Sequence, residues 1–299
     1  MSSLKTLEET DHLQQQSPLV VFGEVLFDCF PGGKRILGGA PFNVAWGLKG
    51  LGEDPLFVSA VGDDEDGNSI RACMANWGME TYGLQTDETH PTGIVEVTIT
   101  DDEPSYEICE ERAWDYVLDP GISCNGMIYH GLLSLRNEIT RATLRAILDR
   151  SNAKRFFDVN LRPPYDSMDL ISSWLNGVSW LKLNLDELET LVGNSVSFED
   201  CRDSVNTLRD RYEIENVLLT AGSKGAKIIG IDGEASFSPA PTPKPFVDTV
   251  GAGDSFAAYT IHGLQKKLPM DQLVAEASQF AAKVCGLQGA TSNDPHFYQ

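Results

Sequence analysis

The chain has 299 residues, with 23 lysines and arginines against 44 aspartates and glutamates, so its formal charge is −21. This length suffices for one large domain or two ordinary ones, and a hydrophobic content of 41% excludes a wholly disordered acidic chain. The excess of negative charge argues against binding to nucleic acid or to an anionic membrane surface. It also raises the question of how the protein would bind an anionic substrate.

The sequence shows no sign of targeting or membrane insertion. No apolar run reaches 18 residues, so no transmembrane helix is expected. Residues 1–17 are polar and predict a tail rather than a signal peptide. The six cysteines are scattered without a C-x-x-C pair, which favours reduced thiols over a disulfide or metal framework. We therefore expect a cytoplasmic protein with a single domain over residues 18–299.

Short apolar runs alternate with helical patterns along the chain. The predicted strands cover residues 18–22, 56–61, 127–130, 156–160, 179–183, 217–220 and 226–231. The predicted helices cover residues 40–51, 65–77, 138–150, 198–212, 252–266 and 270–285. Alternation of buried strands with helices predicts an α/β fold, in which a mostly parallel sheet is covered on both faces.

Two segments break this rhythm. Residues 92–100 alternate apolar and polar side chains and are followed by a second short run at 106–109, and residues 25–37 also have the pattern of a hairpin. They are either edge hairpins without a role or a small β-sheet lid over a site, with lid segments at about 25–37 and 91–118. The alternation leaves one apolar face that needs cover, which predicts a homodimer formed through the lid.

The strongest chemical signal is DTVGAGDSF at residues 248–256, directly before and into a predicted helix. Gly251 and Gly253 let the backbone approach a ligand closely. The unpaired N–H groups of the helix start, including that of Ala252, form a site for an anion. Asp254 lies in the mouth of this site, where a carboxylate can take a proton from an attacking hydroxyl. The alternative is an ordinary loop in which the aspartate caps the helix.

A second signal is GGAPFNVA at residues 38–45, again just before a predicted helix. Gly38 and Gly39 permit close contact between the backbone and a small ligand, and Asn43 offers both a donor and an acceptor, as a polyol requires. Taken alone, the stretch is equally consistent with a turn that enters a helix.

Together these motifs resemble those of the ribokinase-like sugar kinases, also called the PfkB carbohydrate kinase family, over residues 18–295. DTVGAGDSF is similar to the family's C-terminal signature, GGAPFNVA to its N-terminal signature, and NLDE at 184–187 to its N-x-x-E motif. GGAPFNVA, the opening GEVLFD and the stretch DVNLR are most similar to fructokinases. Val159 departs from the usual D-P-N-x-R and Phe42 is bulkier than the common residue, and both departures bear on the shape of the sugar pocket.

The resemblance implies a ribokinase-like three-layer α/β/α core and an ATP-dependent sugar kinase with Asp254 as general base. The backbone N–H groups of Ala252, Gly253 and Asp254 would hold the transferred phosphate. The implied sugar-binding residues are Asp28, Gly38, Gly39, Asn43, Asn160 and Arg162. The implied nucleotide-binding residues are Lys182, Asn184, Thr220, Gly222 and Gly225.

The implied cofactors are ATP and Mg²⁺, with a K⁺ site near Asp248. Asn184 and Glu187 would organise Mg²⁺ through water, as this ion prefers. The chain has neither a Walker A motif nor the glycine-rich loop of protein kinases, so ATP must be held differently. Backbone donors and a metal ion also resolve the charge question, because surface carboxylates are screened over about 8 Å at physiological salt.

Other acceptors and one other class of function stay open beside fructose. A kinase for another sugar or a nucleoside would share these motifs. A sugar acid of the 2-keto-3-deoxygluconate type would need cations in the lid, for which Lys34, Arg35 and Arg112 are candidates. A kinase acting on phosphorylated sugars would need a cationic pocket for a second phosphate. A non-catalytic sugar- or nucleotide-binding regulator would need a defect in the catalytic set, and the sequence shows none.

Overall fold

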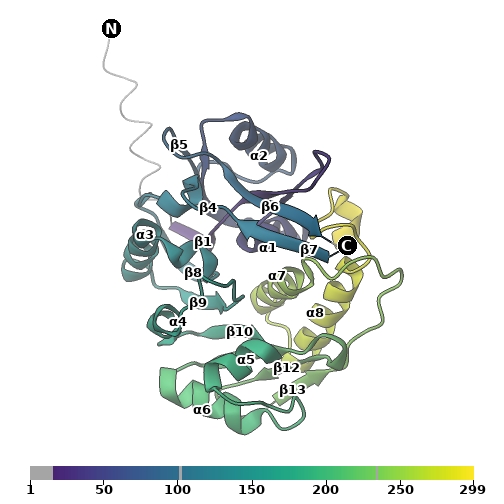
Figure 1. The fold of residues 1–299 in the computed structure, drawn as a ribbon. Coiled ribbons are helices and arrows are strands. Elements are labelled where there is room, and N and C mark those ends of the chain that lie inside the picture. Colours follow the sequence, from purple (N-terminus) through teal and green to yellow (C-terminus); the bar gives the residue numbers. More distant parts are fainter. Residues whose placement is uncertain (1–15, 101–102, 234) are drawn as a thin grey trace.

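The computed structural model describes residues 16–100, 103–233 and 235–299, which form two separate β-sheets with helices packed around the larger one (Figure 1). Within these residues the larger sheet has nine strands in the order β13-β12-β11-β10-β9-β8-β1-β4-β5. Neighbours from β11 to β5 are parallel, whereas β12 and β13 add an antiparallel edge. The strands are β1 (Gln16–Phe22), β4 (Leu56–Gly62), β5 (Leu84–Asp87), β8 (Ser123–His130), β9 (Lys154–Asp158), β10 (Trp180–Asn184), β11 (Asn216–Thr220), β12 (Ala226–Ile229) and β13 (Ala235–Ser238).

Helices cover both faces of this sheet, as the alternating pattern predicts. One face packs against α1 (Ala40–Gly50), α2 (Glu65–Asn76), α7 (Ala252–Gln265) and α8 (Met270–Val284). The other packs against α3 (Glu138–Asp149), α4 (Met168–Leu175), α5 (Leu185–Val192) and α6 (Arg202–Tyr212). Strand β1 supplies both cores in alternation, Val20 and Phe22 to one and Leu19 and Val21 to the other. The predicted α/β class is confirmed.

The boundaries of some elements differ from the predicted ones. Strand β1 begins at Gln16, so the last two residues of the predicted tail are part of the sheet, and the rest of that tail lies outside the described residues. Helix α6 begins at Arg202 rather than at residue 198. The short elements β5, α4, α5 and β13 were not predicted, because four to eight residues carry little periodicity by which to identify an element.

Two further features concern the helices and the cysteines of the described residues. None of their helices is long and apolar enough to cross a membrane. All six cysteines are free thiols.

The second sheet joins the two predicted hairpins into one four-stranded layer, in the order β3-β2-β6-β7. Its strands are β2 (Leu26–Cys29), β3 (Arg35–Gly38), β6 (Gly93–Thr100) and β7 (Glu103–Ile108). Strand β2 pairs in parallel with β6, a contact between segments more than 60 residues apart that only the folded chain reveals. In Figure 1 this sheet lies in front of the carboxyl ends of the large sheet, beside α7. We refer to it below as the lid sheet.

Part of the apolar side of the lid sheet is covered within one chain, whereas Ile99 of β6 is 55% exposed. Val95 and Val97 are buried in a cluster with Leu26, and Phe30 and Ile108 pack against it. The dimer argument assumed that this face of residues 92–100 is bare, and for Val95 and Val97 that assumption is wrong. A homodimer through the lid stays a prediction, without that support.

A buried ion pair anchors the segment that returns from the lid to the core. Arg136, at the end of a short 3₁₀ turn after β8, donates from Nε and Nη2 to the carboxylate of Asp115, both at 2.7 Å. Nη2 also donates to the carbonyl of Cys109 at 2.6 Å, just after β7. The side chains of Arg136 and Asp115 are only 7% and 3% exposed, and the guanidinium stacks on Trp114. The end of the lid is therefore tied to the large sheet through one arginine.

The variant Arg136→Met should lower the free energy of unfolding by about 3–5 kcal/mol, because it leaves the carboxylate of Asp115 buried without its partner. Chemical denaturation followed by tryptophan fluorescence measures this loss. The matched control Arg150→Met breaks the exposed pair with Asp119, in which both side chains are over a third exposed, and should cost less than about 1 kcal/mol. Equal small losses for both variants would contradict the anchoring role.

Candidate active site

The carboxyl ends of the parallel strands open into a cavity of about 870 Å³, roofed by Leu26, Val95 and Ile108 of the lid sheet. Open α/β sheets bind their ligands at this edge. Nearly all predicted site residues line the cavity: Asp28, Gly39, Asn43, Asn160, Arg162, Lys182, Asn184, Glu187, Thr220, Gly222, Gly225, Gly251, Ala252, Gly253 and Asp254. The fold thus gathers residues from both signatures and from the strand ends between them.

Two predicted residues do not line the cavity. Gly38 is buried at the end of β3, where a side chain would meet the carboxylate of Asp28 at 3.5 Å, so it supports that residue from behind. Asp248 accepts a hydrogen bond from the backbone of Val250 at 3.1 Å and closes a turn ahead of α7. A K⁺ site at Asp248 stays a prediction.

Asp254 is the third residue of α7 and lines the cavity at the N-terminal end of this helix. Its Oδ2 accepts a hydrogen bond from Nδ2 of Asn43 at 2.8 Å, which connects the two signature motifs across 211 residues of sequence. Burial raises the pKa of Asp254 from 3.8 to about 6, the bond from Asn43 opposes this rise, and the nearby charge of Asp158 adds to it. Such a carboxylate is a stronger base than a surface aspartate and is still ionised at neutral pH.

The first turn of α7 offers fewer free donors than the motif predicts. The N–H of Ala252 donates to the carbonyl of Thr249 at 3.1 Å. The N–H groups of Gly253 and Asp254 lie in the first turn, where a helix provides no carbonyl for them. An anion here would therefore bind mainly to the N–H groups of Gly253 and Asp254. The N–H of Ala252 could bind it only while also donating to Thr249.

A buried ion pair lies under this turn. Lys182 of β10 and Asp158 of β9 are direct partners across the parallel strands, and the ammonium contacts both carboxylate oxygens at 2.9 Å. Tyr129 donates to the same carboxylate at 3.2 Å. Although burial opposes the charged form, Asp158 keeps the pKa of Lys182 above its ordinary value. A side chain at Gly253 would approach the ammonium to 3.4 Å, so the cation lies next to the proposed anion site.

Asn184 and Glu187 form a reciprocal cap at the start of α5. Oδ1 of Asn184 accepts from the backbone of Glu187 at 2.9 Å, and Oε2 of Glu187 accepts from the backbone of Asn184 at 2.7 Å. Oε1 of Glu187 accepts from the backbone of Leu161 at 3.0 Å. In the residues that the structure describes, no three acidic, histidine or cysteine side chains are grouped to hold a metal ion by themselves. The pair therefore fits an ion held through water, because each oxygen already has a protein donor.

The sugar-side residues come from the lid and from the end of β9. Burial raises the pKa of Asp28, on β2, and the positive charge of Arg162 opposes this rise. Asn160 adopts a φ of +40°, a left-handed conformation that asparagine tolerates better than most residues. Arg162 is exposed and donates to the carbonyl of Leu161 at 2.8 Å. Arg162 also lines the cavity, and no carboxylate of the described residues forms an ion pair with it.

Sequence reasoning missed part of the cavity wall. Asp158 stands in the DVNLR stretch but had no assigned role, and Glu24 of the GEVLFD opening had none either. The loop before α7 lines the cavity with Ala240, Pro241, Thr242, Pro243 and Phe246, opposite Ala281, Ala282 and Cys285 at the end of α8. The proline-rich composition of that loop was the only signal available, and it indicates a loop rather than a binding surface.

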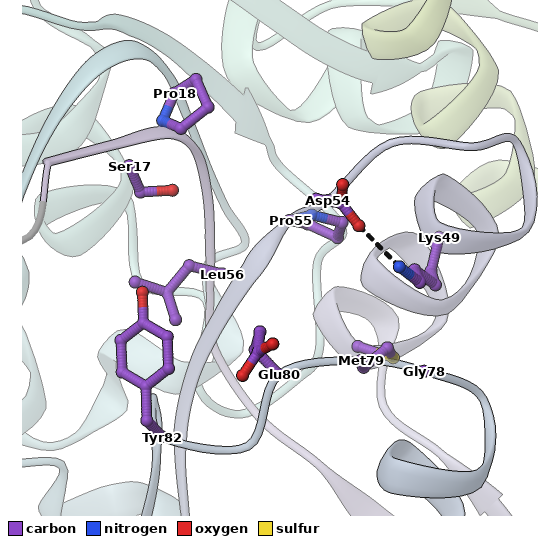
Figure 2. A pocket seen from close by; sticks show the side chains of 10 residues that line it. All are labelled: Ser17, Pro18, Lys49, Asp54, Pro55, Leu56, Gly78, Met79, Glu80 and Tyr82. Atoms are coloured by element: carbon purple, nitrogen blue, oxygen red, sulfur yellow. Dashed lines mark hydrogen bonds and ion pairs between the residues drawn. The ribbon is translucent and has the colours of Figure 1, made fainter.

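A second, smaller hollow of about 180 Å³ lies at the opposite, amino-terminal edge of β1 and β4 (Figure 2). Lys49 and Asp54 point toward each other there and form an ion pair at 2.5 Å. Pro18 and Leu56, at the beginnings of the two strands, form part of its wall. Its position separates it from Asp254, so it takes no part in the site.

Comparison with known proteins gives the same assignment as the geometry. A family model described as pfkB family carbohydrate kinase matches residues 30–296. The chain is 30% identical to a fructokinase of Klebsiella pneumoniae, covering 91% of this chain and 92% of the relative. Its fold is similar to an aminoimidazole riboside kinase from Salmonella enterica (24% identity, TM-score 0.77, 94% and 96% of the two chains). It is also similar to a fructokinase from Vibrio cholerae (21% identity, TM-score 0.77, 92% and 94%). The protein belongs to the pfkB family of carbohydrate kinases.

Proposed function

We propose that this kinase transfers the γ-phosphate of ATP to a hydroxyl of a sugar, with fructose as the preferred acceptor and Asp254 as the base. The observation that carries the proposal is the place of Asp254. Its carboxylate faces a cavity large enough for both substrates, directly beside the free N–H groups of a helix start. The relative at 30% identity is named a fructokinase, which supports fructose as the acceptor.

The roles of the groups around Asp254 follow from where charge changes during transfer. Asp254 takes the proton of the sugar hydroxyl as its oxygen attacks the γ-phosphorus in line. The N–H groups of Gly253 and Asp254, with the ammonium of Lys182 close by, stabilise the negative charge on the transferred group. Asp28 and Asn43 hold the sugar hydroxyls and keep the attacking oxygen in place.

The nucleotide lies toward β11 and α8 in this proposal. Thr220, Gly222 and Gly225 present the backbone of the turn after β11, on which the phosphates and ribose would lie. Pro243, Phe246 and the end of α8 supply an apolar slot suited to a flat base. A structure that is similar at 22% identity is a sugar kinase from Pyrococcus horikoshii in complex with ATP, which supports ATP as the nucleotide.

A divalent cation accompanies the nucleotide. Among the described residues that line the cavity, only Arg162 and Lys182 are basic, against the carboxyl groups of Glu24, Asp28, Asp158, Glu187 and Asp254. Lys182 is already paired with Asp158, so little protein charge remains for a triphosphate. Asn184 and Glu187 are the residues that would hold Mg²⁺ through water, and the ion would neutralise the phosphate oxygens.

Of the cations that could bind a sugar acid, Arg162 lines the cavity but the three lid candidates do not. Lys34, Arg35 and Arg112 do not line it. Arg35 makes a two-pronged ion pair with Asp66 at 2.7 and 2.6 Å, near the start of α2. This arrangement favours a neutral sugar over a sugar acid.

A panel of acceptors tests the proposal directly: fructose, ribose, tagatose, 2-keto-3-deoxygluconate and adenosine, each assayed for ADP release. Fructose should show the highest kcat/KM, because polyol acceptors rather than extra cations line the sugar side. Preference for another acceptor would reject fructose as the substrate but would leave the proposed kinase activity in place. Sugar binding by calorimetry without ADP release from any acceptor would instead identify a non-catalytic binding protein.

The variant Asp254→Asn should lose at least about 10³ in kcat while binding the sugar nearly normally, because the amide keeps an acceptor for Asn43 but cannot take a proton. The wild-type kcat should fall as the pH drops through about 6, where Asp254 becomes protonated. Steady-state kinetics with calorimetry measures both effects. The exposed Asp271→Asn serves as a charge-matched control and should keep full activity; retained turnover in Asp254→Asn would reject Asp254 as the base.

Removal of divalent metal with excess chelator should abolish ADP release, since few protein charges face the phosphates. Restoration by Mg²⁺, titrated at constant ATP, should follow the concentration of the metal–nucleotide complex. Full turnover in the presence of chelator would contradict the metal requirement.

A further inference from the structure

Glu24 is an acidic residue in the cavity wall to which the proposed reaction assigns no role. It follows β1 by two residues, is only 3% exposed, and lines the cavity together with Asp28 and Asn43. Its Oε2 has no hydrogen-bond partner among the described residues. Buried polar atoms almost always have a partner, and one that lacks it in the free protein often meets a ligand.

Asn43 presents a second acceptor of the same kind. Its side chain is 8% exposed, and its Nδ2 is committed to Asp254 at 2.8 Å. Its Oδ1 has no partner in the described part of the chain. Two buried oxygens without donors therefore lie in one wall of the cavity, beside the proposed base. Groups that donate hydrogen bonds, such as the hydroxyls of a sugar, would complete both.

The backbone holds Glu24 firmly in this place. Strand β1 lies between β8 and β4, so its carboxyl end is the point where the chain order of the sheet reverses, the usual position of a ligand in such sheets. A side chain at Gly39 would meet the carbonyl of Glu24 at 2.7 Å. Gly39 has a φ of +107°, which also disfavours any other residue. Glu24 is thus packed against the glycine pair that the sequence motif predicts for sugar binding.

We propose that Glu24 is a sugar-binding residue that determines specificity, and that its free oxygen and Oδ1 of Asn43 accept hydrogen bonds from two hydroxyls of the bound sugar. The inference rests on the proposed function as a sugar kinase and adds a contact to it. It predicts that affinity for the sugar, rather than the rate of transfer, depends on Glu24.

The charges around Glu24 give this contact a pH dependence. Burial raises the pKa of Glu24 to about 7; a backbone hydrogen bond, Arg162 and Arg136 oppose this rise, and Asp254 adds to it. Arg136 is paired with Asp115, whereas Arg162 donates only to the carbonyl of Leu161 among the hydrogen bonds of the described residues. A hydroxyl that donates to the carboxylate favours the ionised form, so the bound state has the lower pKa. Sugar binding should therefore be strongest above pH 7 and weaken as the pH falls through 7, whereas kcat follows Asp254 near pH 6.

Two variants test the contact. Glu24→Leu removes both carboxyl oxygens at similar size and should weaken fructose binding by about 30-fold, measured by calorimetry at pH 8 without nucleotide. Glu24→Gln keeps one acceptor and no charge, so it should weaken binding less and abolish the change of affinity between pH 6 and 8. Both should keep kcat within about threefold at saturating sugar. Glu24→Gln should not lower the Tm, because Oε2 has no hydrogen-bond partner among the described residues and the amide keeps the other acceptor.

The control is Glu96→Gln, the same change on an exposed position of the lid sheet, and it should leave affinity, kcat and Tm as in the wild type. Wild-type affinity with an unchanged pH dependence in both Glu24 variants would overturn the inference while leaving the kinase in place. A loss of Tm in both variants that parallels the loss of affinity would also overturn it, in favour of a structural role. A wild-type protein that neither binds sugar nor releases ADP with any acceptor would instead reject the proposed function itself.

Discussion

The ion pair between Lys182 and Asp158 is the interaction on which the site depends. It joins β9 to β10 at their carboxyl ends and keeps a charged ammonium inside a protein that carries a large excess of negative charge. A buried lysine is stable in its charged form only beside such a partner. This ammonium lies next to the first turn of α7, where a side chain at Gly253 would contact it at 3.4 Å. The ion pair, the helix start and Asp254 therefore form one unit.

The sugar end of the cavity has more hydrogen-bond acceptors than donors. Glu24 and Asn43 each keep a buried oxygen without a donor in the described chain, and Asp28 reaches the same space from the lid sheet. Burying these oxygens without donors costs free energy in the free protein. The same oxygens can accept hydrogen bonds from the hydroxyls of a polyol. The two ends of one cavity thus differ in what they lack: the phosphate end needs positive charge, and the sugar end needs hydroxyl hydrogens.

Much of the fold was predictable because the evidence is local. Continuous apolar runs identify the buried parallel strands, and each long helix carries its own periodicity. The two hairpins were recognised from their sequence patterns. Their pairing into one lid sheet through β2 and β6 was not predicted, because the sequence of a strand does not identify the strand with which it pairs. The same reason explains the wrong assumption about Val95 and Val97: periodicity shows that one face is apolar, not what covers it.

The sequence by itself determined the class of chemistry, since the glycines, Asn43 and Asp254 stand in contiguous motifs whose local geometry is short-ranged. Only the tertiary structure decided which charged and polar side chains lie close enough to affect one another's hydrogen bonding and pKa. Asn43 meets Asp254 across 211 residues of sequence, and Lys182 meets Asp158 across 24. Oε2 of Glu24 lies in the cavity wall with no hydrogen-bond partner among the described residues. These relations depend on strand order and register, which place side chains within a few ångströms regardless of their separation along the chain. Hydrogen bonding and pKa follow from that proximity, and so they became visible only in the folded protein.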